Sequence, residues 1–290
     1  MIPYRFLCAL AVALALPALP ALAASAKKAP APKAAREGKF AGLPGPVVAT
    51  LHALQGKGQI GEVSREVEEG ETVFEVDIAH GADTRTYTLD AEGVQLNVEL
   101  FSSEVPAPVM AAIKTESGGG RVEFISRSVE EGHAVYDVQI TKGGKKAMMI
   151  FAAAGTLIGR QVSLGELPAK IQEAVKAQLT GGKLGSLFQG PDAEGDPSYT
   201  GAGIRSGRTR WFTLDDDGRL ISEEEKIVWT EVPAPVRQAI ANHLGGTDHV
   251  RVSRVKEEDR VRFDVLAMRG AELTAFSVRP DGKVSAANDP

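Results

Sequence analysis

The chain has almost no cysteine. Among its 290 residues the single cysteine is Cys8, which lies inside an apolar run near the N-terminus. One cysteine cannot form an internal disulfide, and the rest of the chain offers no thiol for catalysis or for a metal. Stability must therefore come from burial of apolar side chains, and hydrophobic residues make up 43% of the sequence.

Histidine is scarce as well. The five histidines show none of the close spacing that is typical of a zinc site, and His243 and His249 merely flank a glycine pair that is typical of a helix end. A loose calcium-loop pattern runs from Thr213 to Glu224, but its first position is not acidic. We predict no metal site and no cofactor.

Serine does not stand in the setting that a nucleophile needs. An activated serine of the common hydrolase type lies in a Gly-x-Ser-x-Gly turn between a strand and a helix. Gly185-Ser186 and Ser206-Gly207 lack this frame. The sequence thus predicts no catalytic residue, and we expect the protein not to be an enzyme.

Basic charge is too sparse for a nucleic-acid partner. Lysine and arginine number 33 against 38 aspartates and glutamates, which gives a formal net charge of -5. No basic block is long enough to neutralise a run of phosphates. We therefore expect no binding to nucleic acid.

The N-terminus has the pattern of an export signal. Arg5 precedes an apolar run over residues 6–16, and Ala21-Leu22-Ala23 forms a cleavage tripeptide. The run contains prolines at its end and is shorter than the roughly 20 residues that a membrane span needs. We predict a signal peptide over residues 1–23, an Ala/Lys/Pro-rich linker over 24–42, no membrane span after cleavage, and a periplasmic or secreted protein.

Two kinds of residue recur along the rest of the chain. Four prolines follow one another at intervals of roughly sixty residues, in motifs such as Val-Pro-Ala-Pro-Val: Pro44, Pro106, Pro168 and Pro233. Four glycines in turn-like settings follow them by roughly fifty residues: Gly93, Gly155, Gly218 and Gly282. The prolines and the glycines recur independently with the same spacing, which indicates an internal repeat.

Helical spacing of apolar residues follows each proline, and alternating strands follow each helix. The pattern predicts an α+β fold of tandem repeats, each with one helix packed on a roughly four-stranded antiparallel sheet. We expect one sheet face to contact the helix and the other to face water. Glu75, Asp137 and Asp264 occupy the same repeat position on that second face, where a shared acidic face and a merely soluble face explain them equally well. The predicted units span residues 43–101, 102–164, 165–229 and 230–290.

The third unit, residues 165–229, departs from the others. A glycine-rich stretch over residues 190–204 replaces an alternating strand, and Arg205, Arg208 and Arg210 then precede Trp211. Arginine beside tryptophan is favoured at protein-binding hot spots, so these four residues are the candidate partner-binding site. A solvated strand with its tryptophan packed under the helix explains the same residues.

The Val-Pro-Ala-Pro-Val helix start, the Tyr-Asp-Val or Phe-Asp-Val strand and the Asp-Gly turn together resemble the PepSY-like family, also described as β-lactamase-inhibitor-protein-like. The second and fourth units carry the pattern best, and the third loses its middle strand motif. The resemblance implies a helix across a curved sheet and a role in binding another envelope or secreted protein. The resemblance also implies inhibition of a peptidase or a β-lactamase, and it implies no catalytic residues.

Three classes of function compete. The favoured one is a non-catalytic protein-binding module of the cell envelope, acting through the exposed sheet face, with a peptidase or another hydrolase as the partner it would inhibit. A structural or assembly scaffold of the envelope is the alternative. An enzyme comes last, because function must be argued from a site and no catalytic site is visible in the sequence.

Overall fold

The computed structural model describes residues 40–68, 71–130, 132–192, 194–205 and 207–286. The predicted signal peptide and residues 24–39 of the predicted linker lie outside these ranges. In the described part, each of the four α-helices is followed by four β-strands. None of the described helices is long and apolar enough to cross a membrane.

The α-helices are α1 (Gly45–Gln55), α2 (Ala107–Glu116), α3 (Ala169–Leu179) and α4 (Ala234–Leu244), and the 3-10 helices are η2 (Leu164–Glu166) and η3 (Trp229–Glu231). The strands are β1 (Gln59–Glu68), β2 (Glu71–His80), β3 (Asp83–Asp90), β4 (Gln95–Glu99), β5 (Arg121–Glu130), β6 (His133–Lys142), β7 (Lys145–Ala152), β8 (Leu157–Gln161), β9 (Lys183–Pro191), β10 (Pro197–Arg205), β11 (Arg208–Leu214), β12 (Leu220–Ile227), β13 (Val250–Glu257), β14 (Arg260–Arg269), β15 (Glu272–Val278) and β16 (Val284–Ala286).

All sixteen strands form one antiparallel sheet in sequence order. The predicted α+β class, with one helix on a separate four-stranded sheet repeated in tandem, is therefore wrong, and the fold is mostly β. The sheet is continuous because the last strand of each predicted unit pairs with the first strand of the next: β4 with β5, β8 with β9 and β12 with β13. No unpaired strand edge is therefore left between the units. The predicted unit boundaries stay predictions, because the sheet runs through all of them.

The helices begin where the prolines predict. Each α-helix starts at the residue directly after one of the four prolines, which serves as its N-cap. A proline at a helix start loses no intrahelical hydrogen bond, and its fixed φ suits helix entry. Each helix then buries an apolar stripe against the sheet, as Val236 and Ile240 of α4 do against Val265 and Phe276.

The recurring glycines are needed where they stand. Gly93, Gly155, Gly218 and Gly282 all have φ between 76° and 86°, a conformation that other residues rarely adopt. A Cβ on Gly93 would lie 2.5 Å from the carbonyl oxygen of Pro46, and one on Gly155 would lie 2.5 Å from that of Pro108. The recurring prolines and glycines keep a constant spacing because each glycine turn packs against the first turn of the helix that the proline begins.

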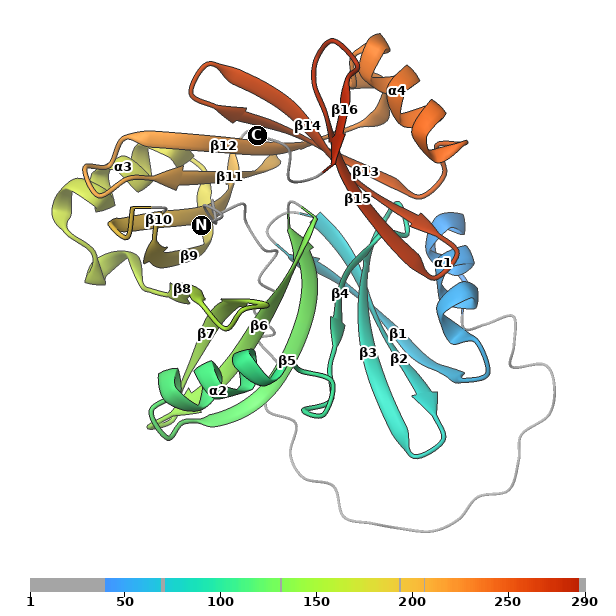
Figure 1. Cartoon of the computed structure of the whole chain (residues 1–290), viewed down its shortest axis with the longest axis horizontal. Helices are drawn as coiled ribbons and strands as arrows, with labels where there is room; N and C mark the ends of the chain where they lie inside the picture. The colour runs from blue at the N-terminus through green and yellow to red at the C-terminus, as the bar shows by residue number, and fades with distance from the viewer. Residues whose placement is uncertain (1–39, 69–70, 131, 193, 206, 287–290) are drawn as a thin grey trace.

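Both faces of the sheet are buried over much of its area. In β6, Tyr136 packs in the cluster under α2, while its neighbour Val135 packs on the opposite face with Met148 and Ile150. The sheet curls, and α1, α3 and α4 lie at its periphery (Figure 1). The expectation that Asp137 faces water is therefore wrong, since it lies on the inner face and is only 3% exposed.

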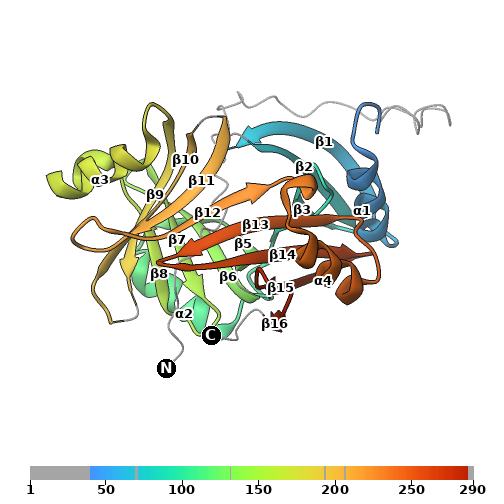
Figure 2. The same cartoon turned by 90° about the horizontal axis from the view of Figure 1, so that it is seen from above.

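The curl brings the first strands against the last ones, as the view from above also shows (Figure 2). Arg251 of β13 donates hydrogen bonds to Glu71 of β2, and Lys226 of β12 donates one to Glu92, which follows β3. Asp90 lies between these pairs and is fully buried. We call these five residues the closure cluster.

Candidate functional site

A cleft opens on the helix-bearing face of the sheet, at the start of α4. Its volume is about 280 Å³. Its lining comes from β11, β12, η3, β13 and β14 and from the N-cap of α4, and consists of Arg208, Ile227, Glu231, Pro233, Arg254 and Phe263. We call it the arginine cleft. Its floor is apolar, because Ile227 and Phe263 belong to the core under α4, and its walls are charged.

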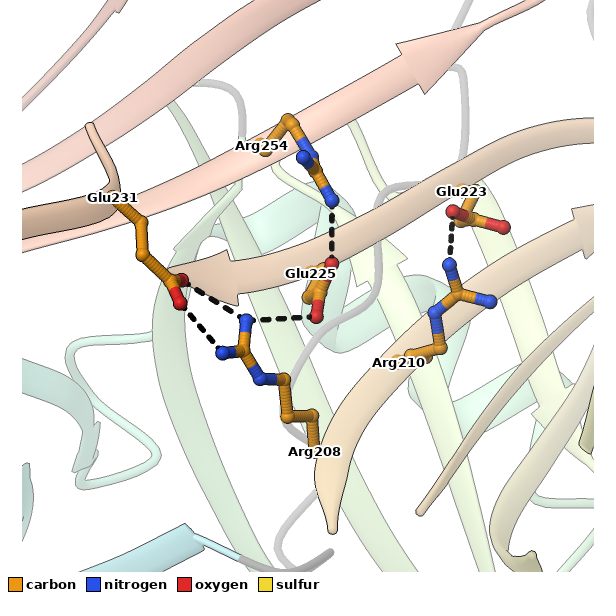
Figure 3. Close-up of polar contacts among 6 residues, drawn as sticks. All are labelled: Arg208, Arg210, Glu223, Glu225, Glu231 and Arg254. Carbon is orange, nitrogen blue, oxygen red and sulfur yellow. Dashed lines mark hydrogen bonds and ion pairs between the residues drawn. The ribbon is translucent and has the colours of Figure 1, made fainter. Parts of the chain in front are cut away.

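An ion-pair network forms the walls of the arginine cleft (Figure 3). Arg208 binds Glu231 in a bidentate manner, through Nη1 to Oε2 at 3.0 Å and through Nη2 to Oε1 at 2.6 Å. Glu225 bridges the two arginines, accepting from Arg208 at 3.3 Å and from Arg254 at 2.7 Å. Both arginine side chains stay about half exposed, at 48% and 50%.

Strand register explains why these charges meet. Glu225 of β12 stands directly opposite Arg210 on one side and Arg254 on the other, so the three side chains point to the same face. Arg210 stands opposite Glu225 but donates its hydrogen bond to Glu223. Arg205 stands opposite Arg208 at the end of the β10–β11 hairpin. The structure thus brings the three predicted arginines to one face.

Trp211 does not share that face. It is 3% exposed and lies on the inner side of the sheet, where the guanidinium of Arg251 sits 5.7 Å from the centre of its ring. Successive residues of a strand point to opposite faces, so Trp211 and Arg210 cannot present one surface. The four predicted partner-binding residues therefore divide into three arginines beside the cleft and one buried tryptophan.

Electrostatics keep the Arg208–Glu231 pair ionised. Hydrogen bonds from Arg208 hold the pKa of Glu231 below its usual range. Hydrogen bonds to Glu231 and Glu225 in turn raise the pKa of the Arg208 guanidinium. Arg208 and Glu231 therefore carry full charge at neutral pH, and neither is poised to exchange a proton there. The arrangement suits recognition rather than acid-base chemistry.

The acids predicted to face water are held differently. Burial raises the pKa of Asp137 to about 7, and its Oδ2 accepts a hydrogen bond from Ser128 at 3.1 Å. Burial and the neighbouring acids raise the pKa of Glu75 to about 7. Asp264 accepts from Arg262 and Ser277. These residues lie on separate strands, and each has its own local surroundings.

Metal binding finds no support in the described ranges. They hold no group of three histidine, cysteine, aspartate or glutamate side chains that could coordinate an ion. His243 packs on the ring of Phe276, with the ring centres 4.4 Å apart. His249 adopts a positive φ of 56° just before β13.

Sequence reasoning missed Glu225, Glu231, Arg254 and Phe263, which complete the arginine cleft. A partial signal was present, because the acidic run Glu223-Glu224-Glu225 follows the arginines after one hairpin turn. Arg254 and Phe263 gave no such signal. They reach the cleft only because β13 and β14 continue the same sheet.

No family model matches the chain, and no curated protein matches it. Among solved structures, a DUF2874 family protein from Bacteroides uniformis is 18% identical with a TM-score of 0.34, and the match covers 41% of this chain and 86% of that one. A BLIP-like protein from Bacteroides fragilis is 21% identical with a TM-score of 0.30, covering 41% of this chain and 87% of that one. Similarity at this level carries no argument about function, and the PepSY part of the resemblance stays a prediction.

Proposed function

We propose that the protein is an exported, non-catalytic module that binds another protein of the cell envelope or a secreted protein through the arginine cleft. The observation that carries the proposal is the cleft itself, where half-exposed arginines stand over a floor of Ile227, Pro233 and Phe263. Arginine next to apolar surface is the composition of binding hot spots. The binding surface is thus the helix-bearing face, in place of the open sheet face that the sequence suggested.

The arginines of the cleft are accessible to a partner. The side chains of Arg208 and Arg254 are 48% and 50% exposed, so another protein can contact them without a change in the fold. A peptidase or a β-lactamase whose activity falls on binding is the partner class that the sequence resemblance suggests.

Affinity capture from the envelope and culture fluid of the source organism tests the proposal. The purified protein and its Arg208→Ala variant would be compared, with Arg219→Ala as the matched control, since Arg219 is 81% exposed on a turn outside the cleft. We expect one partner that the protein and the control retain and the Arg208 variant loses. Loss of turnover by a captured hydrolase at equal molar ratio would establish inhibition. Equal capture of several abundant envelope proteins by all three forms would instead favour the scaffold role.

A further inference from the structure

We propose that the arginine cleft recognises an acidic side chain that stands next to an apolar residue in an extended segment of the partner. This inference rests on the proposed function and names the chemistry of the partner at the same site. Three independent features of the cleft carry it: a local excess of positive charge, unused hydrogen-bond donors on Arg254, and an apolar floor of limited size.

Positive charge exceeds negative charge around the cleft, although the whole chain is acidic at a formal net charge of -5. The arginines are Arg205, Arg208, Arg210, Arg237 and Arg254, and the acids paired with them are Glu223, Glu225 and Glu231. Arg237 donates to the backbone carbonyls of Thr230 and Val232 instead of to an acid. In the described part of the chain, Arg205 and Arg237 thus keep uncompensated charge that a carboxylate would balance.

Arg254 has donors to spare. A guanidinium offers five N–H groups, and in the described part of the chain Arg254 uses one nitrogen, Nη2, to bind Glu225. Arg208 is already engaged through both terminal nitrogens. An incoming carboxylate would therefore bind Arg254, where a charge-assisted hydrogen bond forms without breaking the existing network.

The start of α4 reinforces this preference. Pro233 lines the cleft and is the N-cap of α4, and the first turn of this helix contains no acidic residue. The N-terminus of a helix carries partial positive charge, which favours an anion placed near it. The guanidinium of Arg254 and the helix end therefore attract the same kind of group.

The size of the cleft limits what can enter. A volume of about 280 Å³ falls just below the range of roughly 300 to 1,000 Å³ that small-molecule sites occupy. The cleft suits one or two side chains of a protein segment. An apolar side chain would cover Ile227 and Phe263, and an adjacent carboxylate would reach Arg254, which stands directly opposite Phe263 in the sheet.

Selection from a phage-displayed library of random peptides tests the inference. Peptides enriched on the purified protein would be synthesised with an amidated C-terminus, so that only side chains supply carboxylates, and each would be paired with its Glu→Gln or Asp→Asn analogue. We expect enrichment of acidic residues beside apolar ones, and about tenfold or greater loss of affinity in the amide analogue. Arg254→Gln should cause the same loss, and Arg219→Gln should not, because Arg219 is 81% exposed on a turn outside the cleft.

The outcomes separate the two proposals. Peptides that lose affinity with Arg208→Ala but bind equally well as amide analogues would overturn the acidic preference and leave the binding function standing. Enrichment of peptides whose binding no cleft variant changes, or no enrichment at all, would overturn both. The peptide analogues need no change in the protein, so a folding defect in the Arg254 variant would not obscure the result.

Discussion

Arg251 and Glu71 lie 180 residues apart in the sequence, and Arg251 donates to Glu71 through Nη1 at 2.6 Å and Nη2 at 3.3 Å. Both side chains are nearly buried, at 8% and 10% exposure. Burial alone would raise the pKa of Glu71, but the charge and hydrogen bonds of Arg251 bring it below the ordinary value. This pair therefore joins the two ends of the curled sheet as charged groups.

Removal of Arg251 should destabilise the whole fold. In Arg251→Met, Glu71 and the fully buried Asp90 lose a cation that lies 2.6 Å and 3.6 Å from their carboxylates. Breaking a buried pair from one side costs about 3–5 kcal/mol, because a charge is left uncompensated. Urea unfolding followed by circular dichroism measures the free energy of unfolding.

Two further variants sharpen this test. Arg219→Met serves as the matched control and should change the free energy of unfolding by less than about 0.5 kcal/mol, because its guanidinium is exposed. Adding Glu71→Gln to Arg251→Met should recover part of the loss. Equal stability of Arg251→Met and the parent protein would show that the closure cluster does not hold the curl.

The sequence indicated local features well and long-range ones poorly. Prolines and glycines act within one turn, so the helix starts after Pro44 and Pro233 and the turns at Gly93 and Gly155 could be predicted. Continuity of the sheet depends on pairing such as β8 with β9, and its curl depends on contacts such as Arg251 with Glu71. Strand patterns look the same in a separate sheet and in a shared one, so no local signal distinguishes the two.

Asp137 should make stability fall as pH rises. Its pKa in the folded protein is raised to about 7 by burial, whereas the unfolded value is about 3.9. The folded state therefore binds more protons between these values, and the free energy of unfolding decreases from about pH 4 to pH 7. Asp137→Asn should increase stability at pH 8 and leave it nearly unchanged at pH 4. Urea midpoints at the two pH values give the comparison.

A matched substitution isolates the effect of burial. Asp216→Asn changes the same functional group in an exposed turn between β11 and β12 and should alter neither midpoint appreciably. In Asp137→Asn the new amide keeps an oxygen that can accept the hydrogen bond from Ser128. Lower stability of Asp137→Asn at pH 8 would mean that Asp137 remains ionised and well paired inside the sheet.

Gly93→Ala should be more harmful than Gly144→Ala, although the two glycines have nearly equal φ of 76° and 78°. A Cβ at Gly93 would meet the carbonyl oxygen of Pro46 at 2.5 Å, whereas nothing lies within 4 Å of one at Gly144. Both variants carry the left-handed strain of about 1–2 kcal/mol, and Gly93→Ala adds the steric clash. Thermal unfolding would compare the variants, and equal losses would exclude packing of this turn against α1 as a constraint.

The candidate site was predictable in one respect that sequence reasoning overlooked. Strand alternation places Arg208 and Arg210 on one face and Trp211 on the other, so the spacing of these residues in the sequence is enough to separate the tryptophan from the arginines. The acids that pair with these arginines come from β12 and η3, and Arg254 comes from β13. Whether these side chains lie beside Arg208 and Arg210 depends on the register between strands, which the sequence pattern did not specify.

The Arg208–Glu231 pair should contribute little to stability, which is why cleft variants can report on binding. Both side chains are partly exposed, at 48% and 38%, and solvent screens such pairs. Because Arg208 lowers the pKa of Glu231, any stabilisation is present above the ordinary glutamate value of about 4.3 and is lost at lower pH. A double-mutant cycle with Arg208→Ala and Glu231→Ala should show a small coupling at pH 7 that vanishes in 1 M salt, where the Debye length is about 3 Å. A large coupling that persists in salt would mean that the pair holds η3 against the sheet, and loss of partner binding in Arg208 variants would then report on structure.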